Sequence, residues 1–453
     1  MDSSSVSRRG FIKTSALTAG AAVLADIGAK QVFAAGSDTI KIGLIGCGGR
    51  GKGAVNNCID AAKLVGAKVE IIAVADLFEE SAKGAKTGFA KLGEACKIND
   101  DHVFWGFDAY KKLIGSGVDM VLHAGPPAFR APHVMAAIEA GKHIFMEKPV
   151  AVDPVGCRMI MEASKMAAEK KLSIVCGTQR RHQNNYLENM KRIHAGDIGE
   201  LVGGQCYWGF GGGIWFRDKK GAFEKLSDLE WQCHNWYHWD WLSGDQICEQ
   251  HIHNIDVLNW CFQGPPKKIF AAGGRMSRDN QILPQVKDSP HLERMGKTDG
   301  HYNMLGNIYD HMAAELEYPN GARCVSISGH VSGGSSRVGE RIVGTKGTST
   351  CSGVIEGEKP FRYEGQKSDP GGMTMEHADL LSSVMGKGPY LNEGQRIAES
   401  TLTAIGIRMS AYTGRELQWD WLLQSKTDIV PKELKPGAGH FPAIAVPGVT
   451  KLI

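Results

Sequence analysis

A glycine-rich loop is the first feature of the chain that could do chemistry. Residues 46–51 read Gly-Cys-Gly-Gly-Arg-Gly, which matches G-x-G-x-x-G, and they lie between a short apolar run and a segment that can form a helix. The first glycine permits a tight turn, the second lets the backbone approach a pyrophosphate, and the third lets helix and strand pack closely. The helix N-terminus adds free N–H groups. The loop predicts a dinucleotide site that uses Gly46, Gly48, Gly49, Arg50 and Gly51.

An acidic residue downstream strengthens this interpretation over that of an ordinary glycine-rich turn. Asp76 ends a second apolar run, 70–76, and follows the last glycine of the loop by 25 residues. A carboxylate at this place can accept hydrogen bonds from both ribose hydroxyls and would repel a 2′-phosphate. We therefore expect the cofactor to be NAD rather than NADP.

A lysine follows another apolar run. Glu147, Lys148 and Pro149 come directly after residues 143–146, which are expected to form a strand. The carboxyl end of such a strand faces the cofactor crevice. There Lys148 could donate a hydrogen bond to a substrate hydroxyl oxygen, or lower the pKa of a neighbouring acid–base group. By itself it could equally be a surface lysine in a turn.

The densest group of polar residues lies at 238–256. Glu249 and His253 are four residues apart, so on a helix they share one face, with Asp256 one turn further on. A carboxylate can orient an imidazole and stabilise its charged form, which would make His253 a general base for a hydroxyl proton. Capping and buried structural roles are the alternative.

A metal site is a competing interpretation of the same region. Potential ligands are Cys233, His234, His238, Cys248, His251 and His253. However, His251 and His253 would lie about 200° apart around a helix, which is poor geometry for one ion. We therefore predict no metal.

The elements that would position these residues fall into two patterns. From 38 to 175, strand-like runs alternate with helical segments, which is typical of a parallel sheet with helices on both faces. After Gly177 the alternation ends. Helices are expected at 185–195, 246–261, 375–386 and 392–413, and strands at 201–210, 268–272, 313–318, 322–329, 340–344 and 348–352. The fold class is α/β, with an N-terminal Rossmann domain and a C-terminal α/β domain that has an open, mostly antiparallel sheet.

The N-terminus resembles a twin-arginine export signal. Arg8 and Arg9 precede Phe11 and Lys13, an apolar run follows at 16–25, and small residues near Ala34 could be a cleavage site. An ordinary N-terminal helix is the alternative. We expect a signal at 1–35, a Rossmann domain at 36–176, a substrate and oligomerisation domain at 177–430 and an extended tail at 431–453. The mature protein would be periplasmic or secreted.

Composition excludes several classes of protein. The chain has 453 residues and a formal net charge of +3 without long basic runs, which argues against nucleic-acid binding. No apolar stretch beyond the signal approaches the ~20 residues that span a bilayer, so no membrane association is expected after cleavage. The 11 cysteines are odd in number and spread along the chain, so they do not form a disulfide framework, although an oxidising compartment could pair two of them.

Taken together, these motifs resemble the glucose–fructose oxidoreductase/inositol dehydrogenase family, Gfo/Idh/MocA. The resemblance covers essentially all of the mature chain, and residues 140–149, Ala-Gly-Lys-His-Ile-Phe-Met-Glu-Lys-Pro, are its most specific element. It implies that Lys148 is the active-site lysine and His253 the catalytic histidine, with Glu249 where the family usually has Asp. It also implies a C-terminal sheet that often mediates homo-oligomers.

The same resemblance suggests cofactor and substrate contacts. Residues 177–182, Gly-Thr-Gln-Arg-Arg-His, match the family's stretch near nicotinamide and substrate. Arg181 and His182 are therefore candidate substrate contacts, and His238 is another. Pro127 resembles the cofactor-side loop, and Glu147 accompanies Lys148 at the cofactor.

Three functions remain open from the sequence. The first is an NAD-dependent dehydrogenase that oxidises a ring hydroxyl of a sugar, glycoside or polyol by hydride transfer. The second is a glycosidase that uses bound NAD in a cycle of oxidation, elimination, hydration and reduction, with Tyr207, Tyr237 or His238 as an additional base. The third is a sugar-sensing protein without activity, against which Lys148 and His253 argue.

Overall fold

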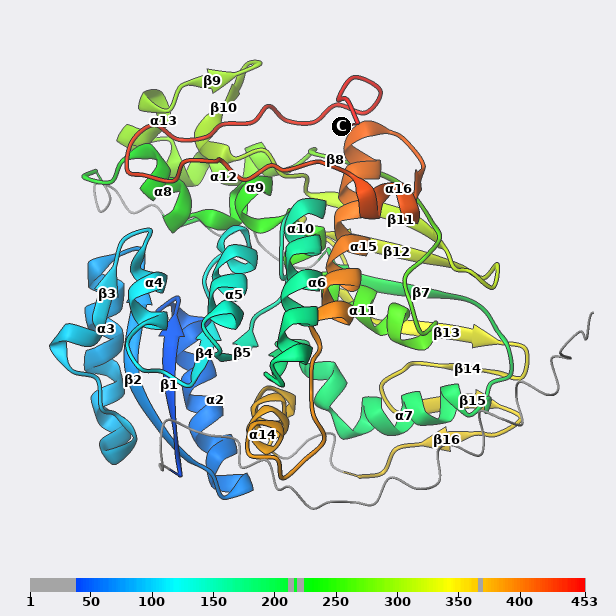
Figure 1. Ribbon diagram of the computed structural model, residues 1–453. Coiled ribbons are helices and arrows are strands. Elements are labelled where there is room, and N and C mark those ends of the chain that lie inside the picture. Colours follow the sequence, from blue (N-terminus) through cyan, green and yellow to red (C-terminus); the bar gives the residue numbers. More distant parts are fainter. Residues whose placement is uncertain (1–37, 211–215, 218–223, 366–369, 453) are drawn as a thin grey trace, which may run out of the picture.

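The first sheet contains six parallel strands at the amino-terminal end of the described chain. The computed structural model describes residues 38–452 except 211–215, 218–223 and 366–369. The strands run in the order β3-β2-β1-β4-β5-β6 (Figure 1). They are β1 (Thr39–Ile45), β2 (Lys68–Asp76), β3 (Val103–Trp105), β4 (Met120–His123), β5 (His143–Met146) and β6 (Ile174–Cys176). Their near-continuous burial is that of a sheet covered on both faces.

Helices connect these strands, as the alternation predicts. They are α2 (Gly49–Val65), α3 (Glu79–Phe89), α4 (Ala109–Ile114), α5 (Arg130–Glu139) and α6 (Pro154–Glu169), with 3-10 turns at Ala90–Ala95, Asp100–His102 and Pro127–Phe129. Asp153 caps α6, because its Oδ1 accepts a hydrogen bond of 2.7 Å from the Gly156 N–H.

The second sheet has nine strands and is mostly antiparallel. Its order is β16-β15-β14-β13-β7-β12-β11-β8-β17, and β7 and β12 are its parallel pair. The strands are β7 (Leu201–Gly209), β8 (Lys268–Gly274), β11 (His311–Glu317), β12 (Arg323–Gly329), β13 (Arg337–Gly344), β14 (Gly347–Ser349), β15 (Val354–Gly357), β16 (Phe361–Arg362) and β17 (Leu417–Gln418). The predicted fold class is confirmed.

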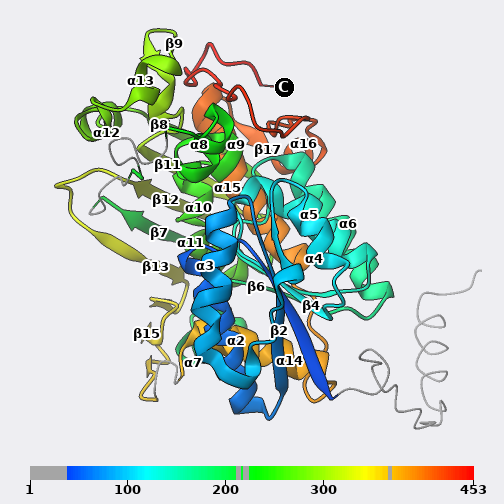
Figure 2. The same ribbon diagram turned by 90° about the vertical axis from the view of Figure 1, so that its left-hand side faces the viewer.

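Helices cover one face of this sheet, and Figure 2 shows its other face without a helix among the described residues. The covering helices are α7 (Asn184–His194), α10 (Gln246–Glu249), α11 (Ile252–Cys261) and α15 (Gly394–Thr413). On the uncovered face Phe270 and Val325 lie in one cross-strand row and are 52% and 41% exposed.

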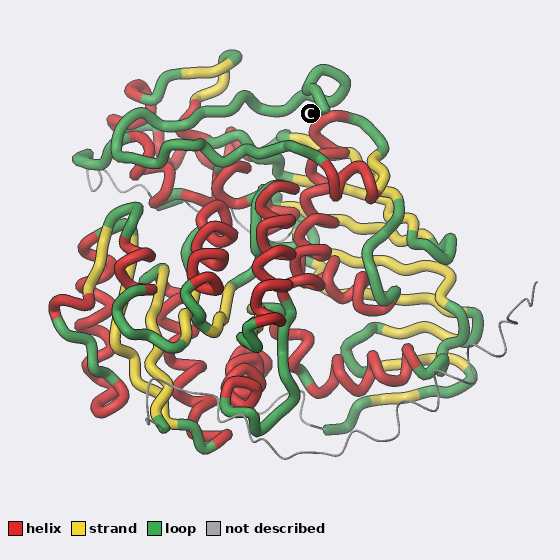
Figure 3. The backbone as a smooth tube through the Cα atoms, in the orientation of Figure 1, coloured by secondary structure: helices red, strands yellow, loops and turns green. Residues whose placement is uncertain are grey.

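Short elements complete the molecule around the end of β8 (Figure 3). They are α8 (Asp228–His234), α9 (Asp240–Ser243), α12 (Arg278–Val286), α13 (Pro290–Arg294), the hairpin β9 (Lys297–Thr298) and β10 (His301–Tyr302), and 3-10 turns at Trp236–His238 and Asn303–Leu305. Residues 425–452 cross this region without forming a helix or a strand. In this segment the His440 N–H donates to Gln232 Oε1 at 2.8 Å. Elsewhere, a 3-10 turn at Gln179–His182 follows β6 and contacts α14, and α16 (Trp419–Gln424) follows β17 and contacts α6.

A late helix completes the core of the first sheet. In Figure 1, α14 (Gly372–Val384) lies beside α2, and its Leu380, Leu381 and Val384 share a buried cluster with Ile42 and Leu44 of β1. The first sheet therefore depends on residues far along the chain for its covering, and α14 brings its own polar side chains to the carboxyl edge of the strands.

The helix expected at 246–261 is interrupted. The structure has α10 and α11 instead, because the His251 N–H bonds to Gln246 O, five residues back. This local π-type turn lets the buried His251 ring reach Ser326 Oγ on the sheet, with Nε2 at 2.8 Å. The turn changes the phase of the helix between Glu249 and His253, so the regular four-residue spacing expected for them is not present.

Candidate active site

Two adjoining pockets lie at the carboxyl edge of the first sheet. The nucleotide pocket is lined by the glycine loop, the end of β2 and the loop after β4, and on its other side by Arg217, Cys233, His234 and Trp236. The reaction pocket continues from it, since Ala124, Gly125 and Trp236 line both. It is lined by the ends of β5 and β6, by Lys148, Glu249 and His253, and by Met373 and Glu376 of α14.

The glycine loop has the geometry that a pyrophosphate requires. Gly46 has φ +92, and a Cβ there would lie 2.4 Å from Gly125 N. A Cβ on Gly51 would lie 1.9 Å from Gly46 O, so only glycine allows α2 to approach β1. Gly48 and Gly49 have open space around the Cβ position, where a phosphate can meet the backbone.

Asp76 lines the nucleotide pocket and is fixed by the loop itself. Its Oδ2 accepts from the Cys47 N–H at 2.7 Å and its Oδ1 from the Phe78 N–H at 2.9 Å. Burial raises the pKa of Asp76, and these backbone donors act in the opposite direction. Each carboxylate oxygen retains a lone pair for a ribose hydroxyl. The pocket therefore fits NAD.

Lys148 and Glu249 form an ion pair across the reaction pocket. Lys148 Nζ lies 3.2 Å from Glu249 Oε1 and also donates to the Glu249 backbone carbonyl. Both side chains are only 12–13% exposed. Burial raises the pKa of Glu249, and Lys148 is the main group that opposes this shift. The expectation that Glu249 orients His253 is wrong for this geometry, because its carboxylate contacts Lys148.

His253 lies beside this pair with a neutral ring. It is 8% exposed, it lines the reaction pocket, and its Nδ1 has no hydrogen-bond partner among the described residues. Burial lowers the pKa of His253 well below its ordinary value, and the positive charges of Lys148 and Arg180 lower it further. The sequence predicted stabilisation of the charged form, whereas the structure favours the neutral one. A neutral imidazole is the form that can accept a proton.

Three residues expected to contact substrate lie elsewhere. Arg181 Nε donates to Asp256 Oδ2 at 2.8 Å, and His182 Nδ1 lies 2.6 Å from Asp379 Oδ2. His238 is fully buried and contacts Arg278. None of Arg181, His182 and His238 is among the residues that line the two pockets.

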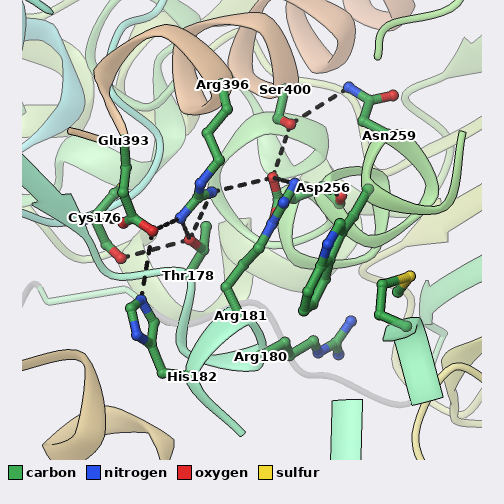
Figure 4. A network of polar contacts seen from close by, with 12 residues as sticks. Cys176, Thr178, Arg180, Arg181, His182, Asp256, Asn259, Glu393, Arg396 and Ser400 are labelled. Carbon is green, nitrogen blue, oxygen red and sulfur yellow. Dashed lines mark hydrogen bonds and ion pairs between the residues drawn. The ribbon is translucent and has the colours of Figure 1, made fainter. Parts of the chain in front are cut away.

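Arg181 and His182 instead belong to a buried network of charges (Figure 4). Arg396 lies at its centre and contacts Glu393, Asp256 and Thr178. His182 Nε2 lies 3.6 Å from Glu393 Oε1. Because Thr178 is next to Gly177 and Gln179, which line the pocket, the network holds this wall of the pocket in place.

The remaining predicted residues are distributed between the two pockets. Gly46 and Gly48 line the nucleotide pocket, whereas Arg50, Pro127, Glu147 and Lys148 line the reaction pocket. Arg50 Nε donates to Glu147 Oε1, which joins the glycine loop to the end of β5.

Several residues of the pocket walls were not indicated by the sequence, and four of them carry side chains of interest. Trp236 lies in an aromatic-rich stretch that was visible without an assigned role, and Gln179 lies in the family-like stretch at 177–182. Arg130 is buried and donates to Gly125 O and Pro149 O, which fixes the loops after β4 and β5. Glu376 had no signal, because no motif surrounds it.

Within the described ranges, no group of three or more His, Cys, Asp or Glu side chains could hold a metal ion. No described helix is both long and apolar enough to cross a bilayer. All 11 cysteines are free thiols, and the Cys261 and Cys351 sulfur atoms lie 3.6 Å apart.

Comparison with known proteins places this geometry in a family. The model of an oxidoreductase family with an NAD-binding Rossmann fold matches residues 40–178, and the Gfo/Idh/MocA C-terminal domain matches 186–350. The chain belongs to the Gfo/Idh/MocA oxidoreductase family. Residues 40–178 have this family's NAD-binding Rossmann fold.

Relatives of this family member include inositol dehydrogenases. It is 30% identical over 250 residues to inositol 2-dehydrogenase/D-chiro-inositol 3-dehydrogenase of Shouchella clausii, covering 55% of this chain and 60% of the relative. It is 33% identical over 222 residues to an inositol 2-dehydrogenase of Klebsiella pneumoniae, covering 49% and 54%. The match thus spans little more than half the length of these relatives.

Solved structures share the fold. A levoglucosan dehydrogenase in complex with NADH and levoglucosan has a TM-score of 0.61 at 16% identity, covering 84% of this chain and 99% of that one. An aldose-aldose oxidoreductase of Caulobacter crescentus has a TM-score of 0.60 at 15% identity, with the same coverage.

Proposed function

We propose that this oxidoreductase is a dehydrogenase that oxidises a ring hydroxyl of a sugar, glycoside or polyol. The observation that carries the proposal is the neutral imidazole of His253 next to the Lys148–Glu249 pair, at the end of the cofactor site. Its Nδ1 has no hydrogen-bond partner among the described residues. A base for the hydroxyl proton and a cation for its oxygen are the two groups that alcohol oxidation needs. The relatives named as inositol and levoglucosan dehydrogenases support this class of substrate.

Each residue has a distinct task in this mechanism. Lys148 donates a hydrogen bond to the substrate hydroxyl oxygen, and Glu249 holds the lysine in place. His253 accepts the hydroxyl proton. When bound, NAD supplies the hydride acceptor. Trp236 and Met373 help to exclude water from the pocket.

The proposal is tested with purified protein, NAD and a panel of inositols, aldoses, anhydrosugars and glycosides. Formation of NADH is followed by absorbance, and the oxidised product is identified by mass spectrometry. His253→Ala is the matched control. If no member of a broad panel is oxidised while NAD binds, the assignment to sugar or polyol oxidation is wrong.

The redox-cycling glycosidase is a second candidate, favoured by one observation. Arg217, His234 and Trp236 face Asp76 across the nucleotide pocket, and the His234 ring lies 5.6 Å from that of Phe78. A cofactor that is enclosed from both sides would remain bound through successive oxidation and reduction steps, as the glycosidase cycle requires. Against it, Tyr207, Tyr237 and His238, the candidates for its additional base, are not among the residues that line the reaction pocket. Glycoside cleavage without NADH accumulation would favour this candidate.

We also propose export through the twin-arginine route, on the residues of the N-terminus. Residues 1–35 lie outside the described part of the chain, so the support is the order of Arg8, Arg9, the apolar run and the small residues alone. The double variant Arg8→Lys, Arg9→Lys should remain in the cytoplasm as the uncleaved precursor. Its normal appearance in the periplasm would contradict the proposal.

We further propose that the protein forms a homo-oligomer through the uncovered face of the second sheet. Phe270 and Val325 are exposed apolar side chains on this face, with Glu315 between them in the same cross-strand row. The support is the resemblance to a family whose C-terminal sheet often mediates homo-oligomers. Light scattering of wild type and of Phe270→Lys, Val325→Lys tests it. A monomeric wild type would overturn it.

A further inference from the structure

A buried carboxyl group in the wall of the reaction pocket is not used by the proposed mechanism. Glu376 of α14 is 1% exposed and lines the pocket. Neither of its oxygens has a hydrogen bond to a described residue, and Oε2 is fully buried. Its ion-pair contact is with Arg50, whose Nη2 lies 3.9 Å from Oε1. Buried polar groups of folded proteins are almost always hydrogen-bonded, so an orphaned one beside a cavity points to a ligand.

Arg50 does not hydrogen-bond Glu376, because its Nη2, which has no hydrogen-bond partner among the described residues, lies 3.9 Å from Oε1. Its Nε donates to Glu147 Oε1, so one guanidinium faces two carboxyl groups. Burial and then the nearby Glu147 raise the pKa of Glu376 well above its ordinary value, while His182 and Arg50 act in the opposite direction. The raised pKa favours the protonated form of Glu376. A protonated carboxyl group offers one O–H donor and one carbonyl acceptor side by side.

The position of Glu376 shows which part of a bound molecule it would meet. Arg50 belongs to the glycine loop and is the second residue of α2, and Glu147 follows the end of β5. A dinucleotide that starts at Asp76 on β2 and crosses the glycine loop brings its second half to β4, β5 and β6. Glu376 meets this half from the side of α2 and α14, whereas Lys148, Glu249 and His253 form a separate polar group for the substrate.

We propose that Glu376 binds the carboxamide of the nicotinamide ring. This inference rests on the proposed function, because it requires the nicotinamide half of NAD in the pocket that contains Lys148 and His253. A carboxamide carries a carbonyl acceptor and N–H donors, so it can pair with the carboxyl group through two hydrogen bonds. Pairing would satisfy the orphaned Oε2 and fix the ring in one orientation.

The test compares the binding of three nucleotides by calorimetric titration of the full mature chain. NAD has the carboxamide, acetylpyridine adenine dinucleotide has a methyl ketone in its place, and ADP-ribose lacks the ring. Glu376→Met should weaken NAD about tenfold, the effect of about 1.4 kcal/mol of lost hydrogen bonding, and should change ADP-ribose by less than about twofold. The preference of the wild type for NAD over the acetylpyridine analogue should largely disappear.

Two further variants make the result specific. Glu376→Gln keeps a donor and an acceptor and should bind NAD within about threefold of wild type. Asp379→Asn is the matched control on the same helix, since its carboxylate contacts His182 rather than the pocket, and it should bind all three nucleotides normally. Thermal unfolding with ADP-ribose checks that each variant is folded.

The outcomes separate this inference from the proposed function. If Glu376→Met, or Glu376→Ala where the methionine variant does not fold, weakens NAD and ADP-ribose equally, or weakens neither, the carboxamide contact is wrong. That holds even if the KM for a sugar changes. Absence of sugar oxidation by a wild type that shows the expected nucleotide preferences would overturn the proposed function and leave this contact standing.

Discussion

Lys148 Nζ lies 3.2 Å from Glu249 Oε1, so the lysine that follows strand β5 of the first sheet is held by a carboxylate of α10. We predict that Lys148→Ala lowers kcat by about 10²–10⁴-fold, because the cation that polarises the substrate oxygen is lost. ADP-ribose binding should stay normal, since Lys148 lines the reaction pocket and not the nucleotide pocket. Steady-state kinetics and titration measure both effects. Lys165→Ala, whose side chain is 70% exposed, is the surface control.

Glu249 should affect kcat through its contact with Lys148 and not through His253. Glu249→Gln keeps an oxygen near Nζ but removes the ion pair, and we expect kcat to fall about tenfold. Combined with Lys148→Ala, the substitution should add little, because both changes remove the same contact. A double-mutant cycle in kcat/KM checks this. Additive losses would show that Glu249 acts on a different group.

The pH profile should report the environment of His253. Burial and the nearby Lys148 lower the pKa of His253, so the ring stays neutral and able to accept a proton below the ordinary imidazole pKa. The acid limb of kcat/KM should therefore lie below about pH 6.5, the ordinary value. Replacing Lys148 by Met removes a positive charge, which raises the His253 pKa and moves the limb to higher pH. A limb that moves to lower pH in this variant would assign it to another group.

The sequence predicted the first sheet and glycine loop well because both depend on local patterns. The apolar runs, the glycines of 46–51 and Asp76 lie close along the chain, and their roles follow from backbone geometry. The turn at His251 could not be predicted, since its cause is a contact with Ser326 on a strand 75 residues away.

The polar residues near the site were harder to assign for the same reason. Arg181 and His182 are of types that bind sugars, but their partners Asp256 and Asp379 lie 75 and 197 residues along the chain. No spacing rule connects them. Glu376 was not predicted because only the packing of α14 on α2 brings it to the pocket.

Asp76 should decide between the two nicotinamide dinucleotides. We predict that Asp76→Ala weakens NAD by about tenfold or more, because the acceptor for the ribose hydroxyls is lost. Binding of NADP should weaken much less, since repulsion of its 2′-phosphate is removed at the same time. Titration of both nucleotides checks this. Because Asp76 also accepts from the Cys47 N–H, Asp76→Asn is the control that keeps an acceptor for the loop. Equal affinity of the wild type for NAD and NADP would contradict this role of Asp76.

Arg396 should contribute more to stability than any exposed ion pair of the chain. It lies between Glu393 and Asp256, whose side chains are 11% and 1% exposed, and it also donates to Thr178 Oγ1 at 3.2 Å. Burial raises the pKa of both carboxyl groups, but the neighbouring positive charges, Arg396 among them, outweigh burial and hold both below their ordinary values. Their stabilising effect is therefore present at neutral pH and is lost as the pH falls.

Removing the cation leaves these carboxylates buried with less compensation, so Arg396→Met should lower the free energy of unfolding by about 3–5 kcal/mol at pH 7. Arg323→Met is the control, since Arg323 is 61% exposed and its ion pairs should contribute at most about 1 kcal/mol. Urea unfolding at several pH values measures both. In the Arg396→Met protein, Glu393 and Asp256 take up protons more readily, so its deficit relative to wild type should shrink as the pH falls from 7 towards 4. A deficit that grows over this range would mean that Arg396 stabilises the fold by packing and not by its charge.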